Sequence, residues 1–127
     1  MLLPLHTRYT DYDTKGHVNN AVYLTYFEIA RGAVWREALG LPDDLEFVVA
    51  EANVRYVTPA MLGESLEIAI RTAEIRTKAW AWEYTIRCVD DGRIVAEGRT
   101  VQVWYDYGER RSVAIPEKAR AALASIE

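Results

Sequence analysis

The sequence predicts a single α+β domain in which one long helix lies against an antiparallel sheet. Two observations carry this prediction. The stretch 20–39 contains no proline and is apolar around most of a helical circumference, and four strand-like segments follow it in succession. Successive strands pair as an antiparallel sheet, and an apolar helix needs such a layer to cover it. A length of 127 residues suits one hydrophobic core, so we assign 1–127 to a single domain.

The first third of the chain is expected to form a strand, a polar loop and the long helix. Residues 2–9 read as a short strand, and 10–17 form a polar turn. Asn19 or Asn20 supplies the N-cap of the helix. The first amides of the helix have no partner within it, so they point back toward the polar turn.

The predicted helix has little polar surface. Its polar positions are three and four residues apart and form one narrow stripe of Thr25, Glu28, Gly32 and Arg36. Gly40, followed by Pro42, is expected to end the helix. Because the helix is apolar on nearly every other side, we expect it to be buried.

Strands and turns account for the rest of the chain. The four strands after the helix cover residues 47–57, 65–77, 80–88 and 93–106. The first strand breaks at 58–59, and 90–92 form a hairpin turn. In the third strand every second residue is large and apolar, beginning with Trp80, whereas small residues such as Gly98 in the last strand leave room for the helix. Residues 116–125 form a short C-terminal helix with a proline in its first turn.

Composition excludes several functional classes. A net charge of −4 at pH 7 argues against a nucleic-acid partner. The single cysteine, Cys88, has no disulfide partner and is expected in the core, while His6 and His17 are too few for a Cys/His zinc site. No apolar run is long enough to span a membrane, and the start is too short for a leader peptide. We therefore expect a cytoplasmic protein without a membrane partner, metal or cofactor.

The polar turn before the helix is where we expect chemistry. It places Asp11, Asp13 and His17 beside the positive end of the helix dipole. Asp11 is interpreted as the side chain of an Asx turn, whereas Asp13 is placed to meet an electrophilic carbonyl. His17 is open between a packing and a catalytic role. The spacing of the two aspartates and Gly16 imitates a calcium loop, but Lys15 holds another ligand position and a valine replaces the bidentate glutamate.

The pattern Asp-x-Asp-x-x-Gly-His-Val-Asn-Asn-x-x-Tyr-x-x-Tyr-x-Glu-x-Ala-Arg, at 11–31, resembles the hotdog-fold acyl-CoA thioesterases of the 4-hydroxybenzoyl-CoA thioesterase type. The resemblance implies a hotdog fold, in which a five-stranded antiparallel sheet wraps around the long central helix. It also implies that Asp13 is the catalytic carboxylate and that the amide at Asn20 polarises the thioester carbonyl. Plant acyl-carrier-protein thioesterases are similar too and add His17 to the site, although they carry an asparagine where this chain has Lys15.

The same resemblance implies a substrate and a partner. The substrate is an acyl-CoA, cleaved to a free acid and CoA, and the partner is a second copy, in a dimer joined sheet edge to sheet edge or in a dimer of dimers. Gly16 and the basic turn with Arg76 and Lys78 are the implied substrate contacts, the turn for the nucleotide phosphates. Whether Asp13 attacks the acyl carbon or deprotonates water stays open. A non-catalytic acyl-CoA or acyl-carrier-protein binding protein and a hotdog dehydratase are the alternative functions.

Overall fold

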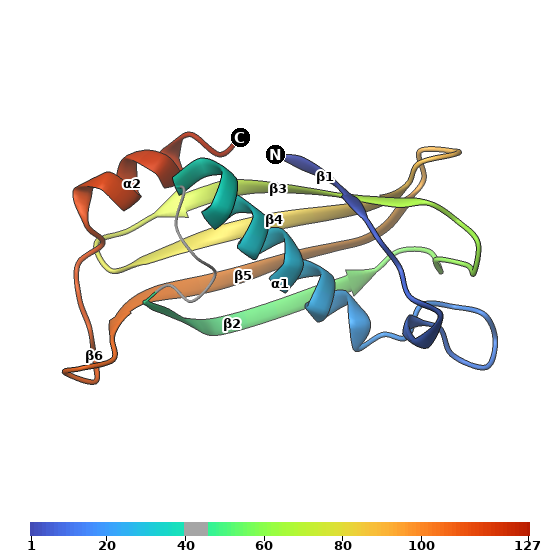
Figure 1. The fold of residues 1–127 in the computed structure, drawn as a ribbon, viewed down its shortest axis with the longest axis horizontal. Coiled ribbons are helices and arrows are strands. Elements are labelled where there is room, and N and C mark those ends of the chain that lie inside the picture. Colours follow the sequence, from blue (N-terminus) through green and yellow to red (C-terminus); the bar gives the residue numbers. More distant parts are fainter. Residues whose placement is uncertain (40–45) are drawn as a thin grey trace.

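The computed structural model describes residues 1–39 and 46–127, and its long helix lies across one face of an antiparallel sheet (Figure 1). The elements in chain order are β1 (Leu2–Leu5), α1 (Val22–Val34), β2 (Phe47–Tyr56), β3 (Leu66–Ile75), β4 (Ala79–Cys88), β5 (Ile94–Asp106), β6 (Arg111–Ser112) and α2 (Glu117–Ala124). The strands follow the order β1-β3-β4-β5-β2, and the two-residue β6 pairs with β5. The predicted α+β arrangement is therefore confirmed, with β6 as an addition. Among the described residues no helix has the length and apolarity needed to cross a lipid bilayer.

The helix begins later than the sequence suggested. Its N-cap is Ala21, so the prediction of Asn19 or Asn20 at that position was wrong. The reason is that Asn19 closes a turn just before the helix. Its side-chain Oδ1 accepts the Ala21 N–H at 3.0 Å, and its carbonyl accepts the Val22 N–H at 2.9 Å. At the other end α1 continues as a π-helical turn over Trp35–Leu39. The predicted stop at positions 40 and 42 lies outside the described residues.

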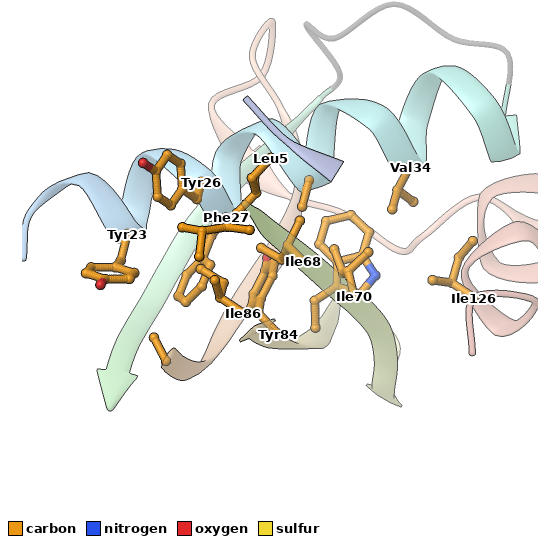
Figure 2. Packing of buried hydrophobic residues seen from close by; sticks show 14 of the residues in the cluster. Leu5, Tyr23, Tyr26, Phe27, Val34, Ile68, Ile70, Tyr84, Ile86 and Ile126 are labelled. Atoms are coloured by element: carbon orange, nitrogen blue, oxygen red, sulfur yellow. The ribbon is translucent and has the colours of Figure 1, made fainter. Parts of the chain in front are cut away.

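The core forms where α1 meets the central strands. Alternate residues of β4 are buried as predicted: Trp80, Trp82, Tyr84, Ile86 and Cys88. Phe27 of α1 stacks on Tyr84, with ring centroids 4.2 Å apart, and Figure 2 shows Phe27 between the helix and the strands that carry Tyr84 and Ile86. Cys88 is buried, so its predicted role in core packing is confirmed.

Gly98 of β5 allows this close approach of the helix. A Cβ at that position would lie 2.3 Å from two ring carbons of Phe27 and 2.8 Å from the carbonyl oxygen of Asn53. These distances are shorter than any ordinary contact, so the expectation that small residues make room for the helix is confirmed at Gly98.

One flank of α1 is open. Leu24 is 45% exposed and Ile29 is 48% exposed. Two apolar residues of the neighbouring edge strand, Val49 and Tyr56, are also more than two-fifths exposed. The prediction of a helix buried on nearly every side is therefore wrong for a single chain, because the sheet ends at β2 before it can wrap around this flank (Figure 1).

Gly98→Ala is expected to lower the free energy of unfolding by roughly 1–3 kcal/mol, the usual cost of overpacking a well-filled core. The added methyl group must displace Phe27 or separate β5 from β2. Urea denaturation measures the change. Gly108→Ala is the control, because its nearest contact is the flexible side chain of Asp106 at 3.2 Å. Equal stability of the two variants would contradict the proposed contact.

Candidate functional site

The segment between β1 and α1 folds as a closed loop with its own backbone hydrogen bonds. The Asp13 N–H donates to the His17 carbonyl at 2.8 Å, and the Asn19 N–H donates to the Asp11 carbonyl at 2.8 Å. At the tip Gly16 has a φ of 73°, a left-handed conformation that favours glycine. Asp13 is therefore held by the backbone of the loop that the sequence singled out.

The Asp13 carboxylate uses one oxygen to bind its own loop and leaves the other available. Oδ1 accepts the Lys15 N–H at 2.9 Å and the His17 N–H at 3.1 Å. Oδ2 accepts no hydrogen bond from the described residues, and the side chain is exposed. The His17 amide first, and then the Lys15 amide, lower the pKa of Asp13 below its usual value. The carboxylate is therefore ionised at neutral pH with one oxygen free to react.

Asp13, His17 and Asn20 line the same small cavity. Its volume is about 160 Å³, and the other lining residues are Val18, Tyr23, Tyr56, Val57, Thr58 and Pro59. The structure thus brings together the three residues predicted to be catalytic. Gly16 does not line the cavity and instead turns the loop beside it. His17 binds Asp13 through its backbone amide, and its ring makes no hydrogen bond to the described residues.

Asn20, just before α1, is the part of the cavity lining with a backbone donor that the loop does not use. Asn19 accepts hydrogen bonds from the N–H groups of Ala21 and Val22. The Asn20 N–H has no acceptor within residues 1–39 and 46–127. An amide without an internal partner at the start of a helix is suited to polarising a carbonyl oxygen.

Tyr56 is a residue of the cavity that the sequence analysis did not identify. Its hydroxyl donates to the Asn20 carbonyl at 2.9 Å, and its ring lies edge-on to Tyr23 at 5.4 Å. The available clue was the alternation of β2, which places Tyr56 opposite Ala96 on the helix side of the sheet. This hydrogen bond joins residues 36 apart in sequence, so no local pattern could have indicated it.

The segment that follows β2 is hydrogen-bonded to the loop and supports it. The Val18 N–H donates to the Ala60 carbonyl at 2.9 Å, and the Leu62 N–H donates to the Gly16 carbonyl at 2.8 Å. Arg93 fixes this segment, because its guanidinium lies 2.6 Å from Glu64 and also donates to the Pro59 carbonyl. These contacts fix the position of the loop against the sheet.

Arg93 also determines whether the acidic groups around it can bind a metal ion. Glu64, Cys88 and Asp91 place their ligand atoms within 4.8 Å of one another. Arg93 donates to both carboxylates, and its hydrogen bonds, followed by the Met61 amide, lower the pKa of Glu64 to about 2. Both carboxylates are therefore already paired with a cation of the chain, and this group is a poor metal site.

The Asp11 side chain is bound within the structure, but it does not form the Asx turn expected from the sequence. Its side chain accepts the Arg8 N–H at 2.9 Å and the Tyr26 O–H at 2.9 Å. Burial raises the pKa of Asp11, and the hydrogen bonds from Arg8 and Tyr26 outweigh it, so the net shift is downward. The Asx-type contact is made by Asp13 instead.

The basic turn lies far from Asp13 of the same chain. Arg76 and Lys78 are in the β3–β4 connection, at the opposite end of the sheet from the start of α1 (Figure 1). The ten residues of β4 that separate the two ends span roughly 33 Å. Arg76 pairs with Glu74, whereas Lys78 is exposed and forms no ion pair with the described residues. The structure does not bring these two cations to the cavity of their own chain.

Comparison with known proteins places this geometry in a family. A model described as the thioesterase-like superfamily matches residues 7–123. The chain is 28% identical over 122 residues to the long-chain acyl-CoA thioesterase FadM of Escherichia coli, covering 90% of this chain and 89% of that protein. It is 33% identical over 88 residues to the acyl-CoA thioesterase YbgC of Helicobacter pylori, covering 68% of this chain and 66% of that protein.

Solved structures agree with these matches. The PA5185 protein of Pseudomonas aeruginosa superimposes with a TM-score of 0.90 at 29% identity, covering 100% of this chain and 91% of that one. A thioesterase of Thermus thermophilus, solved in complex with coenzyme A and zinc, superimposes with a TM-score of 0.87 at 31% identity, covering 99% of this chain and 93% of that one.

Proposed function

This chain belongs to the thioesterase-like superfamily and has the hotdog fold, and we propose that it hydrolyses acyl-CoA thioesters to a free acid and CoA with Asp13 as the catalytic carboxylate. One observation carries the assignment of the site. The cavity at the start of α1 combines an ionised carboxylate that has a free oxygen with a backbone amide that has no internal acceptor. Thioester hydrolysis needs these two groups, one beside the acyl carbon and one beside the carbonyl oxygen.

The reaction requires few further groups. The thioester carbonyl oxygen accepts the Asn20 N–H, which polarises the acyl carbon. Asp13 Oδ2 then either attacks that carbon to form an anhydride, which water opens, or takes a proton from water that attacks directly. The carbon–sulfur bond breaks, and CoA leaves as a thiolate. A thiol is a much stronger acid than an alcohol, with a pKa of about 8.5 for cysteine, so a strong general acid is unnecessary. Oxygen-18 from labelled water that appears in the Asp13 carboxylate after a single turnover identifies the anhydride route, because the general-base route places the label only in the free acid.

A panel of acyl-CoA esters, assayed with a thiol reagent that detects free CoA, tests the activity. Release of CoA supports hydrolysis. Binding of acyl-CoA without release identifies a non-catalytic binding protein, and water loss from a hydroxyacyl chain with an intact thioester identifies a dehydratase. The three outcomes differ in which bond changes.

Asp13→Asn is expected to lower kcat at least about a hundredfold, because the amide keeps the size of the carboxylate but is neither a base nor a nucleophile. Steady-state kinetics with an acyl-CoA measures this, and KM is expected to change little. Because the loop amides lower the pKa of Asp13, its protonation should reduce the wild-type kcat only below about pH 4.

Asp90→Asn, in an exposed turn that does not line the cavity, is the matched control for the loss of one charge. Near-wild-type turnover in folded Asp13→Asn would remove Asp13 from the mechanism. A fall in kcat between pH 8 and 5 that disappears in Asp13→Asn would contradict the low pKa.

A second copy of the chain is proposed to complete the site. The ten-residue edge strand β2 and the open flank of α1 together expose Leu24, Ile29, Val49 and Tyr56. A long, apolar, unpaired edge is suited to antiparallel pairing with its own copy. Such pairing places the Tyr56 end of one β2 beside the Phe47 end of the other. The cavity of one chain then adjoins a groove of about 720 Å³ on its partner, lined by residues of α1 and the start of β2.

Sedimentation velocity is expected to give the mass of two or four chains for the wild type. Ala52→Lys should shift the mass toward one chain and reduce turnover in parallel, because Ala52 is exposed in the middle of β2 and lysine on a strand edge opposes pairing. Ala124→Lys, on the exposed side of α2, is the control. A fully active wild-type monomer would refute the shared site.

The same pairing relates the basic turn to the cavity of the other chain. A two-fold axis at β2 brings the partner's β3–β4 turn to the same end of the joined sheet as Asp13. The partner's turn then lies between three and four strand spacings from β2 of the first chain, roughly 17 Å. The pantetheine arm of CoA is long enough to cover this span, which supports Arg76 and Lys78 as contacts for the nucleotide phosphates of a substrate bound across the interface.

Arg76→Ala combined with Lys78→Ala is expected to raise KM for acyl-CoA about tenfold with kcat nearly intact, because the loss is binding energy remote from the reacting carbon. The contact is exposed, so salt should weaken it in the wild type. The same thioester on pantetheine, which lacks the nucleotide, should show no change. A KM for acyl-CoA equal to that of the wild type would place the phosphates elsewhere.

A further inference from the structure

A buried carboxylate connects the reactive loop to the helix beside it. Asp11 is 1% exposed, and Tyr26 of α1, which binds it, is also 1% exposed. The Tyr26 hydroxyl donates to Asp11 Oδ2 at 2.9 Å across 15 residues of sequence. Arg8 encloses the other side, with its N–H on Oδ2 at 2.9 Å and its Nε on Oδ1 at 3.1 Å. Both oxygens of Asp11 are therefore occupied by groups of the chain.

We propose that Asp11 and Tyr26 form a latch that positions the Asp13 loop for hydrolysis, an inference that rests on the proposed function. Asp11 does not act on the substrate, because it is buried and its oxygens are already bound. It positions Asp13, which follows two residues later and whose only hydrogen bonds to described residues are within the loop and not to α1.

The backbone of Asp11 transmits this position to the loop. The Asp11 N–H donates to the Arg8 carbonyl at 2.9 Å, and the Asp11 carbonyl accepts the Asn19 N–H at 2.8 Å. Asp11 and Asn19 are thus the two ends of the loop that carries Asp13. A side chain anchored to α1 at one of these ends fixes the loop relative to the Asn20 amide, which lies at the start of the same helix.

The energetic cost of breaking the latch makes it persistent. A buried carboxylate that loses a hydrogen-bond donor costs more than the bond itself contributes, so Asp11 has a strong preference to keep Tyr26. Burial and the neighbouring carboxylate raise the pKa of Tyr26, so its hydroxyl remains a donor. A displacement of about 1 Å at a reacting group can lower a rate about a hundredfold, so small movements of the loop matter for catalysis.

Tyr26→Phe tests the latch, with Tyr84→Phe as the matched control. Each variant removes one buried tyrosine hydroxyl. The Tyr84 hydroxyl forms a 2.7 Å hydrogen bond with Thr100, and the Tyr84 ring stacks on Phe27. Tyr26→Phe is expected to lower kcat roughly ten- to a hundredfold with KM changed less than about twofold. Tyr84→Phe is expected to keep the wild-type kcat at a comparable loss of melting temperature.

Amide hydrogen exchange supplies a readout that does not depend on hydrolysis. The Lys15 and His17 N–H groups, which bind Asp13 Oδ1, should exchange at least about tenfold faster in Tyr26→Phe and at the wild-type rate in Tyr84→Phe. If Tyr26→Phe does not fold, Asp11→Asn is measured in its place, because the amide keeps one acceptor oxygen where the carboxylate has two.

The two measurements separate the latch from the proposed function. Unchanged exchange of these amides in Tyr26→Phe overturns the latch, whatever happens to kcat. Equal losses of kcat in Tyr26→Phe and Tyr84→Phe also overturn it, because they reflect stability alone. Faster exchange in a protein whose wild type releases no CoA from any acyl-CoA supports the latch and overturns the proposed function.

Discussion

The close contact of α1 with β5 determines the rest of the structure. Phe27 lies directly over Gly98 and stacks on Tyr84, so the depth of the helix is fixed near its middle. The helix begins at the Tyr56 end of the sheet, where Tyr56 binds the Asn20 carbonyl. The cavity is consequently formed at that end, where the loop after β1, the start of α1 and the segment after β2 meet.

Backbone groups determine most of the electrostatics of the cavity. Two loop amides bind one oxygen of Asp13 and keep the carboxylate charged, and the start of α1 offers an amide without an internal acceptor. Backbone donors cost no side-chain entropy and cannot swing away, so they suit a site that must stabilise charge without reorganising. Such a cavity needs few reactive side chains to carry out the proposed hydrolysis.

The sequence predicted the elements well because their patterns are local. The alternation that begins at Trp80 and the apolar stretch of α1 each follow from a few neighbouring residues. Asp13 lines one cavity with His17 and Asn20, and its catalytic role stays a prediction. What the sequence missed depends on distant partners: Tyr56 binds Asn20 across 36 residues, and Arg93 binds Glu64 across 29. The wrong N-cap had a local cause, since either asparagine could have filled that position.

The open flank of α1 and the small size of the cavity have the same physical origin. A sheet that ends at β2 covers the helix on one side only, which leaves Leu24 and Ile29 half exposed and leaves the cavity bounded by one chain at about 160 Å³. That volume accommodates a thioester group but not an acyl chain with its pantetheine arm. In the proposed dimer, a second copy continues the sheet across β2, covers the flank and encloses the larger groove in the same step. The apolar surface that a single chain leaves uncovered is thus the surface that the proposed pairing uses.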